Sequence, residues 1–384
     1  MTYALGQGTG PLSGLKVVEI AGIGPSPHAC MILADLGADV IRIERPGGQM
    51  LTGGPNDLLN RGRPSVALNL KDPEAIATVL DLVAEADVLI EGMRPGTTER
   101  LGLGPEECHA RNPRLVYGRM TGWGQDGPLA KAAGHDMNYI AITGALFGMG
   151  QDKGRPHFPS NLVGDFGGGS TYLVIGVLAA LLEARVSGAG QVVDAAIVDG
   201  TAHLNAMSAG MLAGGNLKEE RGANLLDGGM PFYDLYETSD GRHMSVGPLE
   251  PQFYDVFVKL LGIEDAPDRY DFDQSPELRR QVAARFASRT QADWSEVFEG
   301  TDACVAPILP LTEAMDHPHM AAREIFVDRE GVRQPQPAPR FSRTTATLST
   351  PPPVKPGIDT RETLTAWGVI DVDGLIERGV AVQA

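Results

Sequence analysis

The chain has 384 residues, of which 42% are hydrophobic and 21% charged, the balance of a packed globular protein rather than a disordered or fibrous one. Its formal net charge of −17 argues against binding to nucleic acid, because phosphate backbones require a clustered positive surface. The three cysteines, at positions 30, 108 and 304, form no Cys-x-x-Cys pair, which argues against a disulfide framework or a zinc site.

The longest apolar run, residues 172–182, is also informative. It has eleven residues, whereas about 20 are needed to cross a bilayer, so it predicts a buried helix and no membrane partner. No basic and apolar leader begins at Met1, and the last residues form no recognised targeting tripeptide. A cytoplasmic location is therefore expected.

The first half of the chain predicts alternating strands and helices. Helical stretches end near Leu36 and run over 76–83, the latter after an Asp72-Pro73 start that supplies an N-cap and a first-turn proline. The expected strands are 15–20, 39–43, 66–70, 88–90 and 115–117. Alternation of this kind is typical of an α/β fold with a parallel sheet. We expect a Rossmann-like large domain over residues 1–200.

Two apolar stretches rich in small residues, 135–149 and 166–185, are predicted to form core helices. Glycines 164, 167, 168 and 169 would each cost about 1 kcal/mol inside a helix relative to alanine. Their clustering predicts a close backbone approach by a ligand or by a neighbouring helix. A strand over 191–197 and a helix from Asp199 are expected next.

The pattern changes after residue 225. Segments 232–237 and 243–246, separated by Ser-Asp-Gly, predict a hairpin, and Glu250-Pro251 begins an amphipathic helix. We expect a smaller α+β domain over 225–320, followed by a C-terminal segment, 325–384, that returns to the large domain.

Two short motifs are weak. Gly22 and Gly24 follow a strand as in a dinucleotide-binding turn, but the third glycine is missing, and Pro25 and Pro27 lack the N–H groups that a pyrophosphate needs. A nicotinamide site is therefore not expected. The His-x-His pair at 317 and 319 has no third ligand nearby, so no metal site is predicted.

A phosphorylated ligand is suggested by the segment 40–63. It carries only two acids, Glu44 and Asp57, but four arginines, which create a locally positive region in an acidic chain: Arg42, Arg45, Arg61 and Arg63.

Ionisable groups stand at the start of both core helices. Asp136 and Asp165 could be helix caps, and His135 could be a buried, hydrogen-bonded histidine. Two such groups on helices predicted to be buried favour a shared cleft instead.

The chain resembles the class III CoA-transferase superfamily over nearly its whole length. Within that superfamily it resembles the α-methylacyl-CoA racemases. The shared motifs are residues 22–28, 33–40, 60–63, 66–71, 94–96, 99–102 and 121–125. The motifs specific to the racemases are residues 134–139, 164–169 and 250–254. In relatives of the transferase type, a tyrosine or another residue replaces His135, and the aspartate that matches Asp136 is the nucleophile.

The resemblance implies interconversion of (R)- and (S)-2-methylacyl-CoA thioesters without a cofactor or a metal. His135 and Asp165 would exchange the α-proton on opposite faces, Glu250 would polarise His135, and the backbone N–H of Asp136 would stabilise the enolate. Two alternatives stay open: a CoA-transferase with Asp136 as nucleophile, and a non-catalytic acyl-CoA-binding protein. The latter has no use for His135 opposite Asp165.

The resemblance also implies the CoA contacts and the assembly. Five basic residues match the CoA-binding region, namely Arg45, Arg61, Lys71, Arg94 and Arg100. Similar family members form interlocked homodimers whose active site lies between the large domain of one subunit and the small domain of the other. The same dimer is expected here.

Overall fold

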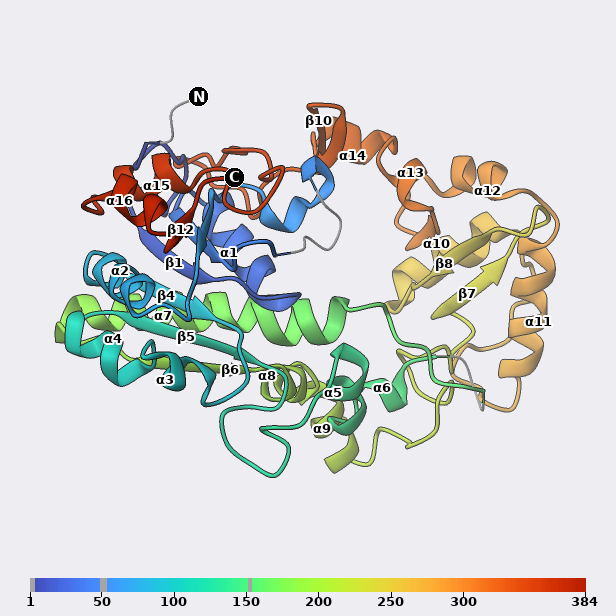
Figure 1. The fold of residues 1–384 in the computed structure, drawn as a ribbon. Helices are drawn as coiled ribbons and strands as arrows, with labels where there is room; N and C mark the ends of the chain where they lie inside the picture. The colour runs from blue at the N-terminus through green and yellow to red at the C-terminus, as the bar shows by residue number, and fades with distance from the viewer. Residues whose placement is uncertain (1–3, 49–53, 151–153) are drawn as a thin grey trace. The chain divides into compact units, whose positions relative to one another are not determined.

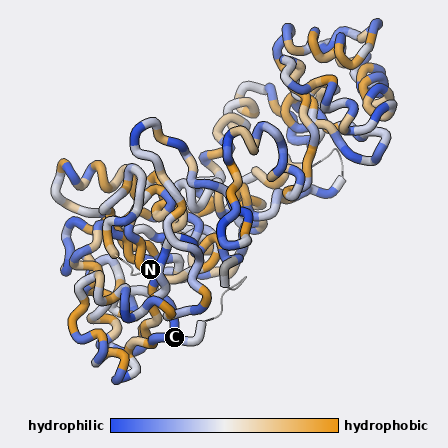
Figure 2. The backbone as a smooth tube through the Cα atoms, turned by 90° about the horizontal axis from the view of Figure 1, so that it is seen from above, coloured by the Kyte–Doolittle hydropathy of each residue, from blue (hydrophilic) through white to orange (hydrophobic). Residues whose placement is uncertain are grey.

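The computed structural model describes residues 4–48, 54–150 and 154–384, and the chain divides into two compact units. The large unit comprises residues 1–143, 159–204 and 323–384, and the small unit comprises residues 144–158 and 205–322. Residues 144–158, which the sequence placed in the large domain, group with the small unit. Apolar and polar stretches alternate along the chain within both units (Figure 2).

The large unit is built on a seven-stranded sheet with the order β12-β3-β2-β1-β4-β5-β6 (Figure 1). All neighbouring strands are parallel except β12, which pairs antiparallel with β3. The mostly parallel α/β fold is thus confirmed. The strands are β1 (Lys16–Ile20), β2 (Asp39–Glu44), β3 (Ser65–Leu68), β4 (Val88–Glu91), β5 (Val116–Thr121), β6 (Val192–Ala196) and β12 (Ala381–Val382).

Helices cover both faces of this sheet, so its central strands are apolar on both sides. One face packs against α1 (Pro25–Asp35) and α7 (Thr171–Ser187), and the other against α2 (Pro73–Ala84), α15 (Thr360–Ala366) and α16 (Val372–Glu377). Paired residues of β1, β2 and β4 follow the two-residue period of strands: Val17, Val40 and Val88 lie in the first core, and Val18, Ile41 and Leu89 in the second.

The start of α2 is as the sequence predicts. Asp72 is the N-cap, and its Oδ1 accepts a hydrogen bond of 2.9 Å from the N–H of Glu74, while Pro73 occupies the first turn. This bond satisfies one of the N–H groups that have no partner within the helix.

The prediction of one continuous helix over 135–149 is wrong. The structure has α5 (Asp136–Ile142) and α6 (Ala145–Gly148), separated by Gly144, whose φ of 83° is in the left-handed region that ends helices. The chain leaves the large unit at this point. The break therefore coincides with the boundary between the units.

The second expected core helix begins earlier than predicted and in an unusual form. Residues Leu162–Ser170 form a π-helix, η3, which continues directly into α7. The strand that follows is β6, and α8 (Ile197–Leu204) begins two residues before the predicted Asp199.

Together, η3 and α7 form one helix of 26 residues, Leu162–Ser187, long and apolar enough by length and composition to cross a membrane. Its inner face nevertheless packs on the sheet, where Leu173, Val174 and Val177 are buried. The prediction of a buried helix is right for this face only, because Ile175 and Leu182 on the outer face are exposed.

The small unit contains a three-stranded antiparallel sheet, β7 (Asp234–Glu237), β8 (His243–Val246) and β9 (Val305–Pro307), and the predicted hairpin is β7–β8. Three helices pack on it around Phe257, Phe286 and Trp294: α10 (Pro251–Leu261), α11 (Ser275–Phe286) and α12 (Gln291–Phe298). Helix α10 begins after Glu250, as predicted.

Shorter elements complete the chain. They are η1 (Gly54–Asn56), η2 (Leu58–Asn60), α3 (Thr97–Leu101), α4 (Pro105–Arg111), α9 (Ala206–Ala213), α13 (Leu311–Ala314), α14 (Pro318–Ala322), β10 (Phe326–Arg329) and β11 (Val332–Pro335).

Candidate functional site

The order of the strands identifies where a ligand is expected. The chain runs outward from β1 through β2 and β3 on one side, and through β4, β5 and β6 on the other. In open α/β sheets, ligands bind outside the carboxyl ends of the strands at such a reversal, here between β1 and β4. The segments that follow these two strands begin at Ala21 and Gly92.

Asp165 lies beside the turn after β1. Gly24 in this turn has a φ of 72°, and a Cβ atom at Gly24 would lie 3.2 Å from the Oδ2 atom of Asp165. Both the left-handed backbone and this close approach favour glycine. The carboxylate predicted to be catalytic is therefore at the sheet's reversal point.

Asp165 is carried by the π-helix η3, in which the N–H of Phe166 donates to the carbonyl of Asn161 five residues earlier, at 3.3 Å. Such i→i+5 segments are rare and are often found at functional sites. The Nδ2 atom of Asn161 also donates to the Oδ2 atom of Asp165, at 3.3 Å. This amide orients the carboxylate, a role that the sequence analysis missed.

Burial raises the pKa of Asp165, and the negative charge of nearby Asp136 raises it further, while the hydrogen bond from Asn161 and the charge of His135 act in the opposite direction. Asp165 and His135 are thus within electrostatic range of each other. A carboxyl group with a raised pKa is a better proton acceptor and donor near neutral pH than an ordinary one.

Asp136 connects η3 to α5 through a hydrogen bond. It is the first residue of α5 and only 6% exposed, and its Oδ1 atom accepts the N–H of Asp165 at 2.7 Å. A second backbone hydrogen bond comes from Gly164, and burial raises the pKa of Asp136. Its Oδ2 atom is buried without a hydrogen-bond partner among the described residues. The side chain therefore links the segment that carries His135 to the segment that carries Asp165.

His135 is the N-cap residue of α5 and is exposed. Its backbone N–H donates to the Oδ1 atom of Asn138 at 3.0 Å, and the N–H of Asn138 donates to the carbonyl of His135 at 2.8 Å. These two bonds fix the backbone at the start of α5. The predicted groups His135, Asp136 and Asp165 are therefore gathered on two connected segments of the large unit.

Glu250 belongs to the small unit, where it is the exposed N-cap residue of α10. Its side chain makes no capping hydrogen bond to its own helix. Its carboxylate is near enough to raise the pKa of the Cys304 thiol, although burial of that thiol is the larger cause. The pairing of Glu250 with His135 stays a prediction.

The glycine cluster is explained by helix packing. A Cβ atom at Gly168 would lie 2.7 Å from the backbone nitrogen of Thr201 on α8, and one at Gly164 would lie 2.8 Å from the carboxyl carbon of Asp136. Gly200 on α8 likewise meets the backbone of Gly168. Of the two expected reasons for the cluster, a ligand or a neighbouring helix, the structure supports the helix.

His28 supports η3 from the other side and was not singled out as a functional residue. Its Nδ1 atom lies 2.6 Å from the Oγ atom of Ser170, and its ring stacks on Phe166 at 4.2 Å. Burial and the charges of Arg61 and Arg63 lower the pKa of His28 to about 4, so the ring is neutral near pH 7. The only signal in the sequence is that His28 follows the turn after β1.

Three of the five predicted CoA contacts follow the carboxyl ends of parallel strands. Arg45 comes after β2, Lys71 after β3 and Arg94 after β4, and all three are exposed. Arg100 is also exposed, on α3, where its Nη2 atom donates to the Oγ1 atom of Thr97 at 3.1 Å. These four cations are available to a phosphorylated ligand.

Arg61 differs from the other four because it is only 3% exposed. Its guanidinium forms two hydrogen bonds to Asp35, at 3.1 and 2.5 Å, and two more to Gln334 and Pro335. Four internal bonds favour a structural role over phosphate binding.

The positive region expected around residues 40–63 is also largely neutralised. Arg42 forms ion pairs with Glu19 and Glu44, both at 2.5 Å, and Arg63 pairs with Glu19 at 2.6 Å. All four side chains are buried. The local charge count did not include Glu19 and Asp35, which pair with three of the four arginines, Arg42, Arg61 and Arg63.

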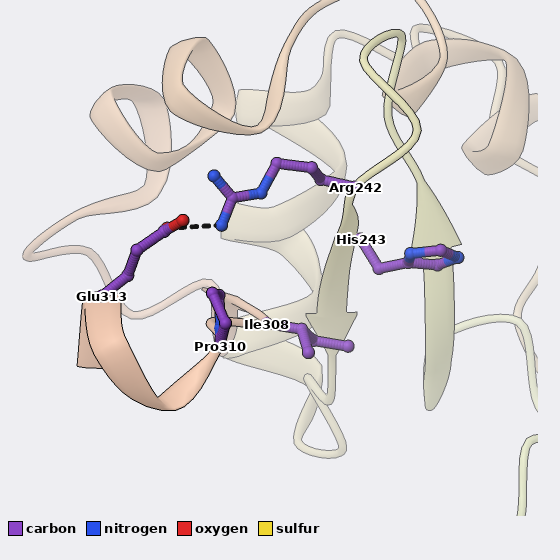
Figure 3. Close-up of a pocket in the computed structure, with 5 residues that line it drawn as sticks. All are labelled: Arg242, His243, Ile308, Pro310 and Glu313. Atoms are coloured by element: carbon purple, nitrogen blue, oxygen red, sulfur yellow. Dashed lines mark hydrogen bonds and ion pairs between the residues drawn. The ribbon is translucent and has the colours of Figure 1, made fainter. Parts of the chain in front are cut away.

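The described residues contain no group of three or more histidine, cysteine or acidic side chains arranged to hold a metal ion. A cavity of about 350 Å³ in the small unit is lined by Arg242, His243, Ile308, Pro310 and Glu313 (Figure 3). The ion pair between Arg242 and Glu313, at 2.5 Å, crosses this cavity, which contains none of the predicted site residues.

Comparison of the sequence with known protein families identifies the family of this chain. The sequence profile described as CoA-transferase family III matches residues 12–360. The chain belongs to this family. Family members similar to it include the "Alpha-methylacyl-CoA racemase" of Mus musculus, 43% identical over 93% of each chain, and the human protein of the same name, 41% identical over 87% of each chain.

A solved structure agrees at the level of the fold. The crystal structure of a CaiB/BaiF family protein from Brucella suis matches with a TM-score of 0.81 and 27% identity, covering 94% of this family III chain and all of the Brucella chain.

Proposed function

We propose that this protein is an α-methylacyl-CoA racemase that interconverts the (R) and (S) epimers of 2-methyl-branched acyl-CoA thioesters. Similarity to the mouse and human racemases over most of the chain supports this activity. The structural observation that carries it is the hydrogen bond from the N–H of Asp165 to Asp136, which joins the segment holding Asp165 to the helix preceded by His135. Two proton-transfer groups are thereby held near one another.

The reaction requires a base on one face of the α-carbon and an acid on the other. When His135 removes the proton, Asp165 in its protonated form donates one to the opposite face, and the reverse reaction exchanges these roles. The enolate formed between the two steps would accept a hydrogen bond from the backbone N–H of Asp136 at the start of α5. These steps need no metal and no cofactor beyond the CoA of the substrate.

Asp165 is suited to both roles because burial and Asp136 raise the pKa of its carboxyl group. His135 would depend on Glu250 to orient its imidazole and to stabilise the protonated form. Exposed Arg45, Lys71, Arg94 and Arg100 would bind the CoA phosphates, while Arg61 would support the loop after η2 from inside the protein.

The activity is tested by incubating one epimer of a 2-methylacyl-CoA in heavy water without an acceptor acid. A racemase gives α-deuterium and both epimers. Absence of exchange, together with CoA transfer when a free carboxylic acid is added, would overturn the proposal in favour of a transferase.

The division of labour is tested by two variants. His135→Ala should abolish racemisation, yet leave slow deuterium incorporation without inversion for the epimer that Asp165 serves, and Asp165→Asn should leave it for the other epimer. The resemblance to the racemases implies that His135 serves the S epimer and Asp165 the R epimer. Folded variants that lose exchange for the same epimer to the same degree would contradict the two-face assignment.

An interlocked homodimer is part of the proposal, in which the small unit of one subunit supplies Glu250 to the large unit of the other. Exposed apolar side chains on α7, namely Ile175, Leu182 and Val186, support burial of this face in an assembly. Mixing inactive His135→Ala subunits with Glu250→Gln subunits, under conditions that allow exchange, should restore activity, because each mixed dimer contains one unaltered site. No restoration in verified mixed dimers would contradict shared sites.

A cytoplasmic location is also part of the proposal. Cell fractionation of the natural host tests it, and recovery of the protein with membranes after a high-salt wash would contradict it.

A further inference from the structure

Arg269 is a buried cation without an acidic partner in the small unit. It is only 5% exposed, and it forms no ion pair with any residue that the structure describes. Buried charges are normally paired, because removing a cation from water is costly. An unpaired buried arginine therefore needs another source of stabilisation.

Three aromatic rings surround Arg269. Its guanidinium carbon lies 5.2 Å from the ring centre of Phe232, 4.9 Å from that of Tyr254 and 4.6 Å from that of Tyr270. The Nη2 atom also donates to the hydroxyl of Tyr270 at 2.7 Å. A cation–π contact is stronger when the cation is removed from water, as it is here. The aromatic side chains thus replace the missing carboxylate.

Two contacts of Arg269 fall on either side of Glu250. The Nη1 atom donates to the carbonyl of Pro248, two residues before Glu250, at 3.4 Å. The ring of Tyr254, four residues after Glu250, packs under the guanidinium, and its buried hydroxyl has no hydrogen-bond partner among the described residues. Tyr254 is therefore held through its ring, by Arg269 and by neighbouring aromatic side chains.

The backbone between these contacts has little freedom. Glu250 is extended, with φ −80° and ψ 148°, as expected for a residue that precedes proline, and its carbonyl accepts the N–H of Tyr254 at 3.0 Å. Its carboxylate is exposed and makes no capping bond. The backbone position from which this side chain extends is set by the segment 248–254, which Arg269 contacts at both ends.

We propose that Arg269 is a positioning residue for Glu250, which acts by clamping the segment 248–254 rather than by touching the substrate. The role of Glu250 as the partner of His135 comes from the proposed function, on which this inference rests. Loosening the clamp would misdirect the carboxylate without changing any group that transfers a proton. Misplacement of a catalytic group by about 1 Å can cost up to about 100-fold in rate.

The test uses Arg269→Met, which keeps an apolar stem of similar length but removes the cation and both hydrogen bonds. Arg280→Met is the matched control, because Arg280 is exposed on α11 and, among the described residues, its ion-pair partner is Glu277. Deuterium exchange of each epimer is measured in the full-length protein, together with kcat, KM and amide hydrogen exchange of residues 249–254.

Arg269→Met should lower exchange of the epimer served by His135 by about 10- to 100-fold, with exchange of the other epimer within about threefold and KM little changed. Amide exchange over 249–254 should accelerate. Arg280→Met should change neither. Arg269→Lys should recover only part of the activity, because an ammonium group cannot stack as a planar guanidinium does.

A double-mutant cycle separates this inference from the proposed function. In a Glu250→Gln background, Arg269→Met should cause no further loss for the epimer served by His135, because its effect passes through Glu250. Additive losses, equal losses for both epimers, or unchanged amide exchange over 249–254 would overturn the inference. If Glu250→Gln alone has no selective effect, the proposed pairing with His135 fails instead, and the amide exchange still decides whether Arg269 clamps the segment.

Discussion

Replacing Gly168 with alanine is expected to push η3 away from α8 and so displace Asp165. The new Cβ atom would lie 2.7 Å from the backbone nitrogen of Thr201 and 3.1 Å from the carbonyl oxygen of Ile197. Both are backbone atoms of α8, so no side-chain rotation relieves the overlap. One of the two helices must shift.

The size of the effect follows from two opposing contributions. Overpacking against a rigid neighbour costs about 3 kcal/mol at the upper end of its usual range, and alanine recovers up to about 1 kcal/mol through its better helix propensity. A net loss of about 2 kcal/mol is expected. For a unit the size of the large one, this corresponds to a decrease in Tm of about 4–8 °C.

The assay combines thermal unfolding with deuterium exchange of each epimer at a temperature where the variant is folded. Because η3 carries Asp165, exchange of the epimer that Asp165 serves should decrease more than exchange of the other. Gly210→Ala on α9 is the matched control: a Cβ atom there meets nothing within 4 Å, so the variant should gain about 0.5–1 kcal/mol with unchanged exchange.

A Gly168→Ala variant as stable as the unaltered protein would show that the close approach of η3 and α8 carries no energetic weight. Equal loss of exchange for both epimers in a destabilised variant would show that η3 does not position Asp165 selectively.

Three further predictions concern charge. Burial lowers the pKa of His28 to about 4, against 6.5 in the unfolded chain, so between these pH values the unfolded chain binds more protons and the folded state should lose stability as the pH decreases. His28→Phe should reduce this dependence of stability on pH, measured by urea unfolding at several pH values. An unchanged dependence would mean that other groups cause it. Asp136→Asn removes a charge that raises the pKa of Asp165, so the acidic limb of the pH–rate profile for exchange on the Asp165 side should move to lower pH, and a shift upward would refute this coupling. Arg61→Met should destabilise the protein by about 3–5 kcal/mol, because it leaves the buried carboxylate of Asp35 unpaired. Arg94→Met should instead raise KM for the acyl-CoA and leave Tm unchanged. The opposite pattern in KM and Tm would exchange the roles of the two arginines.

The sequence by itself determined the parallel-sheet fold, because its signals are local. The apolar runs at Lys16–Ile20 and Asp39–Glu44 and the Asp72-Pro73 start each depend on residues within a few positions. The resemblance of residues 134–139 and 164–169 to the racemases likewise needed only the order of residues, and it located His135 and Asp165 before any contact was visible.

Only the tertiary structure decided which polar groups are available for chemistry, because their partners are distant in sequence. Arg61 resembles Arg94 in the sequence, yet its pairing with Asp35 and Gln334 leaves it buried, whereas Arg94 stays exposed. Asp136 likewise accepts the N–H of Asp165, 29 residues away, a contact that the local sequence does not predict. Local patterns specify helices and strands, but the pairing of buried charges and backbone groups is settled by which elements pack together.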